Sequence, residues 1–300
     1  MDKGFIGAVR LICPCAENVP LCEKSSFRIG GAARLCAFPK SEDELMTLAA
    51  AARGAGVRYA VLGNMTNVLA PDDGYDGLII FTTSLCDVRF DGDTVTAESG
   101  APITSLAFSA GKRCLSGLEF AYGIPGTVGG AIFMNAGAYG GEMKSVVRSV
   151  RAYSATDGRV REYTAEECEF GYRESRFRRG GEIILSAEMT LVPGNADEIG
   201  AVMRKNMDAR KEKQPLDRPS AGSTFKRPEG YFAGKLIEDA GLKGYRIGGA
   251  AVSEKHAGFI VNEGGATERD VSALTEYIKA KVYENSGVKL EEEIIHLGRE

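Results

Sequence analysis

Residues 123–141 read GIPGTVGGAIFMNAGAYGG and hold seven of the chain's 38 glycines. Average glycine usage of about 7% would place only about one glycine there. Glycine lets a backbone take positive φ and lets a ligand approach without meeting a Cβ. From Ile124 to Ala131 the run becomes apolar and predicts a short helix, whose amides would face a phosphate or pyrophosphate. A flexible linker is the competing interpretation, but the apolar residues 132–134 favour a ligand-binding loop.

The composition excludes several classes of protein. Of the 300 residues, 44% are apolar, and the net charge is −4 with acids and bases interspersed, which argues against a nucleic-acid partner. No apolar run approaches the roughly 18–20 residues that a membrane-spanning helix needs. The first residues, MDKGFIGAVRLICPCAENVP, lack the order of a signal peptide. We therefore expect a cytoplasmic protein without a membrane partner.

The seven cysteines are an odd number and do not resemble a disulfide framework. Their only cluster is Cys13, Cys15 and Cys22. A zinc site there would need further ligands, and both histidines, His256 and His296, lie far away in sequence. We expect reduced thiols and no metal.

Periodicity and turn signals predict a mixed set of helices and strands. A capping box at Ser41–Glu44 starts one helix, and Asp-Gly pairs at 91–92 and 157–158 predict two hairpins. The expected helices are 41–54, 196–213, 231–240 and 267–285, and the expected strands are 57–62, 77–82, 88–90, 94–97, 150–153, 159–163, 182–192, 249–252, 259–262 and 289–297.

The common nucleotide-binding motifs are missing from the chain. Neither G-x-x-x-x-G-K-[ST] nor a Rossmann G-x-G-x-x-G occurs. A second candidate anion turn follows an expected strand and reads Gly63-Asn64-Met65-Thr66-Asn67. Two such turns suit a ligand with two phosphates, although this turn taken alone is equally compatible with an ordinary strand-ending loop.

An ordered set of motifs carries a resemblance to a known family. The set comprises the two glycine turns, FRIGG at 27–31, GYRESRF at 171–177, PSAGSTFK at 219–226 and LEEEI at 290–294. From about Ser25 to Gly298 the chain resembles the UDP-N-acetylenolpyruvoylglucosamine reductase family. It is similar to the shorter form, which lacks a tyrosine-bearing insertion between the catalytic arginine and serine.

The resemblance implies an α+β fold. It implies a two-subdomain FAD-binding domain of the PCMH/vanillyl-alcohol-oxidase type, followed by a smaller α+β substrate-binding domain. We accordingly expect an N-terminal extension over 1–24, the FAD-binding domain over 25–193 and the substrate-binding domain over 194–300. A shift in composition near residue 193 independently suggests the second boundary.

The resemblance also implies an activity, in which NADPH reduces FAD. The reduced flavin then passes a hydride to UDP-N-acetylglucosamine enolpyruvate, giving UDP-N-acetylmuramate for peptidoglycan. The partners would be this small substrate and NADPH, with the protein a monomer or weak oligomer. Two alternatives remain open: another FAD-dependent oxidoreductase with the same flavin domain, and a catalytically inactive nucleotide-binding homologue.

Three residues match the family's catalytic positions. Arg173 would bind the substrate carboxylate, since a guanidinium presents a planar fork to that group. Ser223 would donate the proton, which needs a dry, electropositive pocket. Glu293 would stay protonated beside the flavin and stabilise the enolate together with Arg173. Without the resemblance, an arginine paired with Glu174, a turn serine and a solvent-exposed acid would be the ordinary interpretations.

The resemblance extends to binding residues. Met65 departs from the family by replacing a glycine, and a Cβ is costly wherever φ is positive; either the turn has another conformation or FAD binds less tightly. Arg227 stands where an asparagine often follows the lysine. His256 is interpreted as structural or lining the cleft rather than catalytic. The residues assigned to FAD are Gly63, Asn64, Met65, Thr66, Asn67, Gly123, Ile124, Pro125, Gly126, Thr127, Gly129, Gly130 and Ala131, and those assigned to substrate are Tyr172 and Lys226.

Overall fold

The computed structural model describes residues 1–298, which divide into two compact units. Unit 1 comprises Met1–Glu17, Leu35–Asn64 and Asp76–Ala209, and unit 2 comprises Asn18–Arg34, Met65–Tyr75 and residues 210–298. The chain therefore passes between the units several times. The linear division at residues 24 and 193 remains a prediction.

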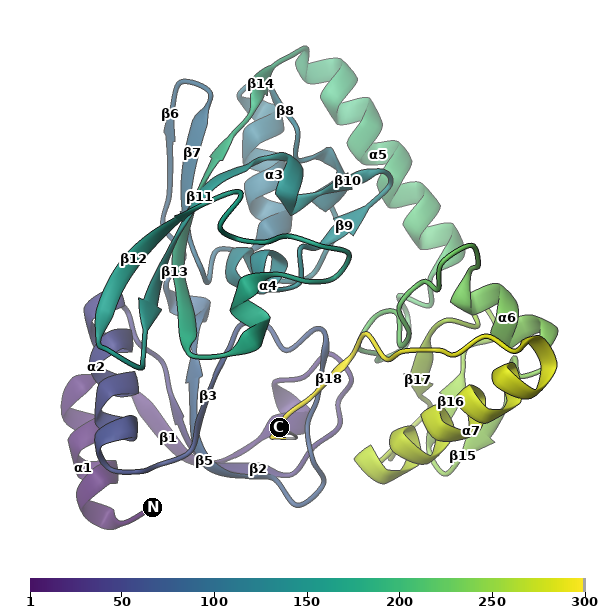
Figure 1. The fold of residues 1–300 in the computed structure, drawn as a ribbon, viewed down its shortest axis with the longest axis horizontal. Coiled ribbons are helices and arrows are strands. Elements are labelled where there is room, and N and C mark those ends of the chain that lie inside the picture. Colours follow the sequence, from purple (N-terminus) through teal and green to yellow (C-terminus); the bar gives the residue numbers. More distant parts are fainter. Residues whose placement is uncertain (299–300) are drawn as a thin grey trace. The chain divides into compact units, whose positions relative to one another are not determined.

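The elements appear in Figure 1. The helices are α1 (Lys3–Ile12), α2 (Glu42–Gly54), α3 (Ile103–Lys112), α4 (Val128–Phe133), α5 (Ala196–Lys213), α6 (Ala233–Asp239) and α7 (Glu268–Ser286). The strands are β1 (Cys15–Pro20), β2 (Ala32–Ala37), β3 (Tyr59–Leu62), β4 (Val68–Leu69), β5 (Tyr75–Phe81), β6 (Val88–Asp91), β7 (Thr94–Glu98), β8 (Leu115–Ser116), β9 (Gly137–Ala138), β10 (Gly141–Glu142), β11 (Val147–Ser154), β12 (Arg159–Thr164), β13 (Glu182–Thr190), β14 (Val192–Pro193), β15 (Arg246–Ile247), β16 (Ala250–Val252), β17 (Ile260–Asn262) and β18 (Ile295–His296).

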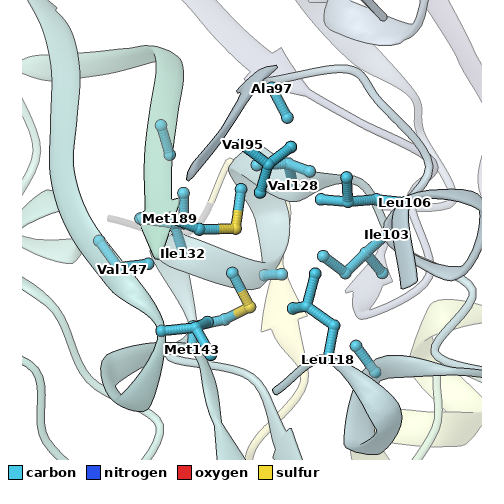
Figure 2. Close-up of a cluster of buried hydrophobic side chains, with 14 of the residues drawn as sticks. Val95, Ala97, Ile103, Leu106, Leu118, Val128, Ile132, Met143, Val147 and Met189 are labelled. Atoms are coloured by element: carbon cyan, nitrogen blue, oxygen red, sulfur yellow. The ribbon is translucent and has the colours of Figure 1, made fainter. Parts of the chain in front are cut away.

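The largest sheet of unit 1 has the order β12-β11-β13-β7-β6 and is antiparallel throughout. Both predicted Asp-Gly hairpins are confirmed within it, as β6–β7 and β11–β12. Its core also takes in α3 and α4. Figure 2 shows Val128 and Ile132 of α4 together with Val95 and Met189 of the sheet. The glycine-rich run is therefore anchored by buried apolar side chains, which excludes the flexible-linker interpretation.

A second sheet has the order β1-β2-β5-β3, with β3 parallel to β5. The first residues of the chain, for which no element was predicted, form α1 beside α2 (Figure 1). Asp2 starts this helix by accepting the Phe5 N–H at 2.8 Å. Phe5, Ile6 and Val9 are buried in the same apolar cluster as Leu45 and other α2 residues. Packing of this apolar face explains why so short a helix forms.

In unit 2, α6 and α7 pack with the three-stranded sheet β15-β16-β17 (Figure 1). Helix α7 begins with a complete capping box between Thr267 and Asp270 and ends at Gly287 in the left-handed conformation. Its buried face carries Val271 and Leu274, among other apolar residues.

Most of the predicted elements are confirmed with shifts of one to four residues at their ends. The predicted helix 196–213 has those bounds in the structure. The predicted strand 289–297 is wrong for most of its length. Only Ile295–His296 is a strand, parallel to β4, and Glu292 forms an isolated bridge with Phe225. The segment changes partner along its length, so no continuous ladder forms.

Within residues 1–298, none of the helices combines the length and apolarity that crossing a membrane requires.

Helix α1 offers a direct test of its packing. Val9 is 0% exposed, whereas Leu11 on the same helix is 91% exposed. We expect Val9→Ala to lower the free energy of unfolding by about 2 kcal/mol, through lost apolar burial and the cavity left behind. Leu11→Ala is the matched control and should change it by less than about 0.5 kcal/mol. Equal losses in urea denaturation would show that α1 does not pack as described.

Candidate functional site

The two loops predicted to hold the cofactor meet in unit 1. The Asn64 side-chain amide donates to Pro125 O at 3.0 Å. A Cβ built on Gly63 would lie 2.4 Å from Thr127 Oγ1, which no real side chain tolerates. Thr127 in turn caps α4 by accepting the Gly130 N–H. Glycine at position 63 is therefore required for the close approach of the two loops.

The sequence predicts that the backbone N–H groups of α4 face a ligand, but in the structure they donate to other parts of the protein. Val128 N–H donates to Ala101 O at 2.8 Å, and Gly129 N–H donates to Ser99 O at 2.8 Å. Gly130 N–H and Ala131 N–H are taken by the side chain and the carbonyl of Thr127. The N–H groups in the first turn of this short helix are therefore all bonded to other groups of the protein. The segment ending at Ala101 runs alongside the helix and supplies two of the acceptors.

Two backbone N–H groups lie just before α4. Among the residues that the structure describes, the N–H groups of Gly126 and Thr127 form no hydrogen bond. Unpaired loop amides next to a close glycine contact are the arrangement that binds phosphate oxygens. The loops therefore fit a dinucleotide cofactor, with the candidate donors at positions 126 and 127 rather than in the helix.

Arg173 lies in a tight turn of unit 1. Gly171 and Glu174 exchange both backbone hydrogen bonds, at 3.0 and 3.2 Å, around Tyr172 and Arg173. Arg173 has φ of 55°, in the left-handed region that such turns normally fill with glycine or asparagine. Strained residues of this kind cluster at functional sites. The Arg173 guanidinium donates to Gly137 O at 3.0 Å and lies 5.2 Å from the ring centre of Tyr172.

Two buried polar residues join this turn to the glycine-rich run. Asn135 donates to Gly171 O at 2.8 Å, and Ser175 donates to Phe133 O at 2.7 Å. Asn135 is 1% exposed and Ser175 is 3% exposed. Sequence reasoning missed both residues, although an asparagine inside a glycine-rich run is a signal for a left-handed position. Asn135 indeed has φ of 40°.

Unit 2 brings the other two predicted catalytic segments together. Glu293 N–H donates to Thr224 O, and Lys226 N–H donates to Glu291 O, both at 2.8 Å. Ser223 and Glu293 therefore lie on neighbouring extended segments that are 70 positions apart in the numbering.

The boundary between the units falls between Asn64 and Met65, so the second half of the turn at 63–67, which is assigned to FAD and is called the flavin turn below, belongs to unit 2. The Asn67 side-chain amide donates to Glu293 O at 3.1 Å, and Ile295 N–H donates to Asn67 O at 2.9 Å. Met65 is 2% exposed with φ of 49°, so this turn keeps a glycine-like conformation despite the Cβ.

The three consecutive acids differ in environment. Glu291 is exposed and lies 3.5 Å from Lys226 Nζ. The Glu292 carboxylate contacts Lys279 Nζ and His296 Nε2, each at 2.6 Å. Burial by itself raises the pKa of Glu292, but hydrogen bonds and charge from His296 and Lys279 outweigh it and lower the pKa to about 2.

The remaining candidates have simpler surroundings. Burial lowers the pKa of His256, and its Nδ1 accepts the Gly258 N–H at 3.1 Å, as suits a neutral, internally satisfied histidine. Burial raises the pKa of the Cys168 thiol to about 12. Within residues 1–298, no group of three or more His, Cys, Asp or Glu side chains is arranged to hold a metal ion.

The strain at Met65 predicts a stability effect. Met65→Gly relieves about 1–2 kcal/mol of left-handed strain. It also loses about 1.5–3 kcal/mol of side-chain burial and adds about 0.5–1 kcal/mol of unfolded-state entropy. We therefore expect Met65→Gly to be less stable by about 1–2 kcal/mol in urea denaturation. Met65→Leu keeps both strain and burial and is the control; a glycine variant more stable than wild type would contradict this balance.

Family models match two parts of the chain. Residues 33–164 match a model described as FAD binding domain. Residues 214–297 match a model described as UDP-N-acetylenolpyruvoylglucosamine reductase, C-terminal domain. The expected α+β fold, with an FAD-binding domain followed by a smaller C-terminal domain, is confirmed.

Similar proteins cover nearly the whole chain. A UDP-N-acetylenolpyruvoylglucosamine reductase of Caldanaerobacter subterraneus is 50% identical, over 94% of this chain and 93% of the relative. The reductase of Clostridioides difficile is 46% identical, over 94% and 92%. The crystal structure of the reductase from Thermus caldophilus matches with a TM-score of 0.79 and 33% identity, over 94% of this chain and 98% of that one. Because relatives 46–50% identical cover 94% of its length, the chain belongs to the UDP-N-acetylenolpyruvoylglucosamine reductase family.

Proposed function

We propose that the protein reduces UDP-N-acetylglucosamine enolpyruvate to UDP-N-acetylmuramate, a precursor of peptidoglycan, with FAD as cofactor and NADPH as reductant. The observation that carries the proposal is the assembly in unit 2, where Asn67 of the flavin turn is hydrogen-bonded to Glu293 and Thr224, next to Ser223, accepts from Glu293. The family membership of the whole chain supports the same activity.

The chemistry divides between cofactor and protein. When bound, FAD supplies the hydride that NADPH provides and that the vinyl CH2 carbon of the substrate receives. The neighbouring carbon takes a proton, so that the carbon–carbon double bond becomes a single bond. The residues of the chain must hold the substrate, stabilise charge on its carboxylate and supply that proton.

Arg173 suits the substrate carboxylate. Hydride addition moves negative charge onto this group, and a guanidinium stabilises it through charge-assisted hydrogen bonds. The turn from Gly171 to Glu174 fixes the backbone of Arg173, and its contact with Gly137 O restrains the guanidinium. Exposed Tyr172 lies beside it and is the first candidate for a further substrate contact.

Ser223 is assigned the proton transfer. Its neighbour Thr224 is 2% exposed and held on both sides, because it donates to Gly258 O and accepts from Glu293 N–H. This rigid backbone would position the Ser223 hydroxyl, which a proton donor needs. Lys226 lies three residues further along the chain, with its ammonium 3.5 Å from exposed Glu291, and is assigned to bind the substrate.

Glu293 is assigned to the enolate-like species together with Arg173. Its backbone is fixed by two hydrogen bonds, from Glu293 N–H to Thr224 O and from the Asn67 side-chain amide to Glu293 O, and nearby Ile295 N–H also donates to Asn67 O. A protonated carboxyl at this position would donate to the developing charge, and donors placed in advance stabilise a transition state without reorganisation.

The activity is tested with the flavin itself. We expect the purified protein to contain or take up FAD, to lose its flavin absorbance with NADPH under anaerobic conditions, and to regain it when UDP-N-acetylglucosamine enolpyruvate is added. Bleaching without recolouring would indicate an oxidoreductase with another acceptor. A protein that FAD cannot reconstitute would favour a nucleotide-binding homologue without catalysis.

Arg173 provides a variant that separates activity from stability. Arg173→Gly relieves the left-handed strain, which offsets the lost hydrogen bond to Gly137 O and the added unfolded-state entropy, so stability should change by less than about 1 kcal/mol. Loss of the guanidinium should reduce kcat/KM by about 10²–10³-fold. Arg179→Gln is the matched control from the same basic stretch, since Arg179 forms an exposed ion pair with Glu169. Steady-state kinetics and thermal unfolding of both variants provide the check. An active Arg173→Gly protein would remove Arg173 from the proposed mechanism.

A further inference from the structure

The acid next to Glu293 has an unusually well-defined environment. The Glu292 side chain is 17% exposed, and its two carboxylate oxygens go to different partners, Oε1 to Lys279 and Oε2 to His296. The exposed side chain of Glu291, by contrast, has a looser contact with Lys226 at 3.5 Å. A carboxylate held at both oxygens has one direction, whereas a solvent-exposed one has many.

Both partners of Glu292 stand on fixed elements. Lys279 belongs to α7, whose N-terminus is closed by its capping box and by Asp72, which accepts from Glu268 N–H at 2.7 Å. His296 belongs to β18, which pairs with β4 directly after the flavin turn. The Glu292 carboxylate therefore connects α7 with the terminal segment, whose strand β18 pairs with β4.

The position of Glu292 has a consequence for its neighbour. Successive side chains of an extended backbone point to opposite sides, and the backbone here is extended enough for Glu292 to bridge Phe225. With Glu292 drawn toward α7, Glu293 is directed away from that helix. The charge of Glu292 is meanwhile compensated by the Lys279 ammonium, and the His296 ring contacts its other oxygen, so Glu292 adds little negative field at Glu293.

We propose that Glu292 is a positioning residue, whose carboxylate, held between Lys279 and His296, sets the direction in which Glu293 faces the substrate. Glu292 does not itself touch the substrate in this scheme. The inference rests on the proposed function, in which Glu293 acts on the enolate-like species.

The test compares Glu292→Gln, Glu293→Gln and the double variant in the FAD-loaded protein. Lys281→Met is the matched control, because Lys281 lies on α7 and pairs with Glu284 away from the terminal segment. Stopped-flow absorbance measures flavin reduction by NADPH and reoxidation by substrate separately. Calorimetry measures substrate binding to the oxidised protein, and thermal unfolding measures stability.

We expect Glu292→Gln to slow reoxidation by about 10–100-fold, as a small misplacement of a catalytic group does. Flavin reduction and substrate affinity should stay as in the wild type. In the Glu293→Gln background the second substitution should add nothing, because a residue that acts through Glu293 has no effect once Glu293 is lost. Lys281→Met should behave as the wild type in every measurement.

Several results would overturn the inference. Unchanged reoxidation in Glu292→Gln would do so, as would an equal further loss in the double variant, which would mean an independent role. Equal loss of both half-reactions with lowered stability would indicate a structural role only. If Glu292→Gln does not fold, Lys279→Met is measured by the same criteria. Normal reoxidation in Glu293→Gln alone would instead remove the proposed role of Glu293 itself.

Discussion

The hydrogen bonds between Asn67 and the terminal segment are the constraint on which the candidate site of unit 2 depends. The Asn67 amide donates to Glu293 O, and Asn67 O accepts the Ile295 N–H. The two partners of the first bond are 226 positions apart. These bonds and the β4–β18 pairing place the proposed acid next to the end of the flavin turn. Thr224, next to Ser223, is joined to the same segment through Glu293 N–H.

Unit 1 shows how a glycine-rich loop is made rigid. Apolar Val128 and Ile132 bury one face of α4, while the helix satisfies its first amides with Thr127 and the segment ending at Ala101. The N–H groups at positions 126 and 127, which have no hydrogen-bond partner within residues 1–298, are consequently held in place by a packed helix. Glycine is needed here for contact with Thr127 and Ser99 rather than for flexibility.

Backbone strain and a buried charge both occur in the segments assigned to cofactor or substrate or directly beside them. Met65 and Arg173 both adopt left-handed conformations that side chains disfavour, and each lies in a segment assigned to cofactor or substrate. Such strain persists only where surrounding contacts impose it: burial of the side chain for Met65, and two backbone hydrogen bonds around the turn for Arg173. The ionised form of Glu292 is likewise maintained by its surroundings. Burial alone would disfavour the carboxylate, but contacts with Lys279 and His296 stabilise it.

The sequence by itself determined the features that arise from neighbouring residues: the Asp-Gly hairpins, the helix from Ala196 to Lys213, and the motifs that place the chain in its family. Only the tertiary structure decided which distant segments pair, because hydrogen bonds such as those of Asn135 with Gly171 leave no local pattern. For the same reason the sequence predicts a regular strand for the acids near the C-terminus, whereas in the structure the partner of this segment changes from Phe225 to β4. The formation of α1 likewise depends on burial of one helix face, since a short amphipathic segment is stable as a helix only when another surface covers it.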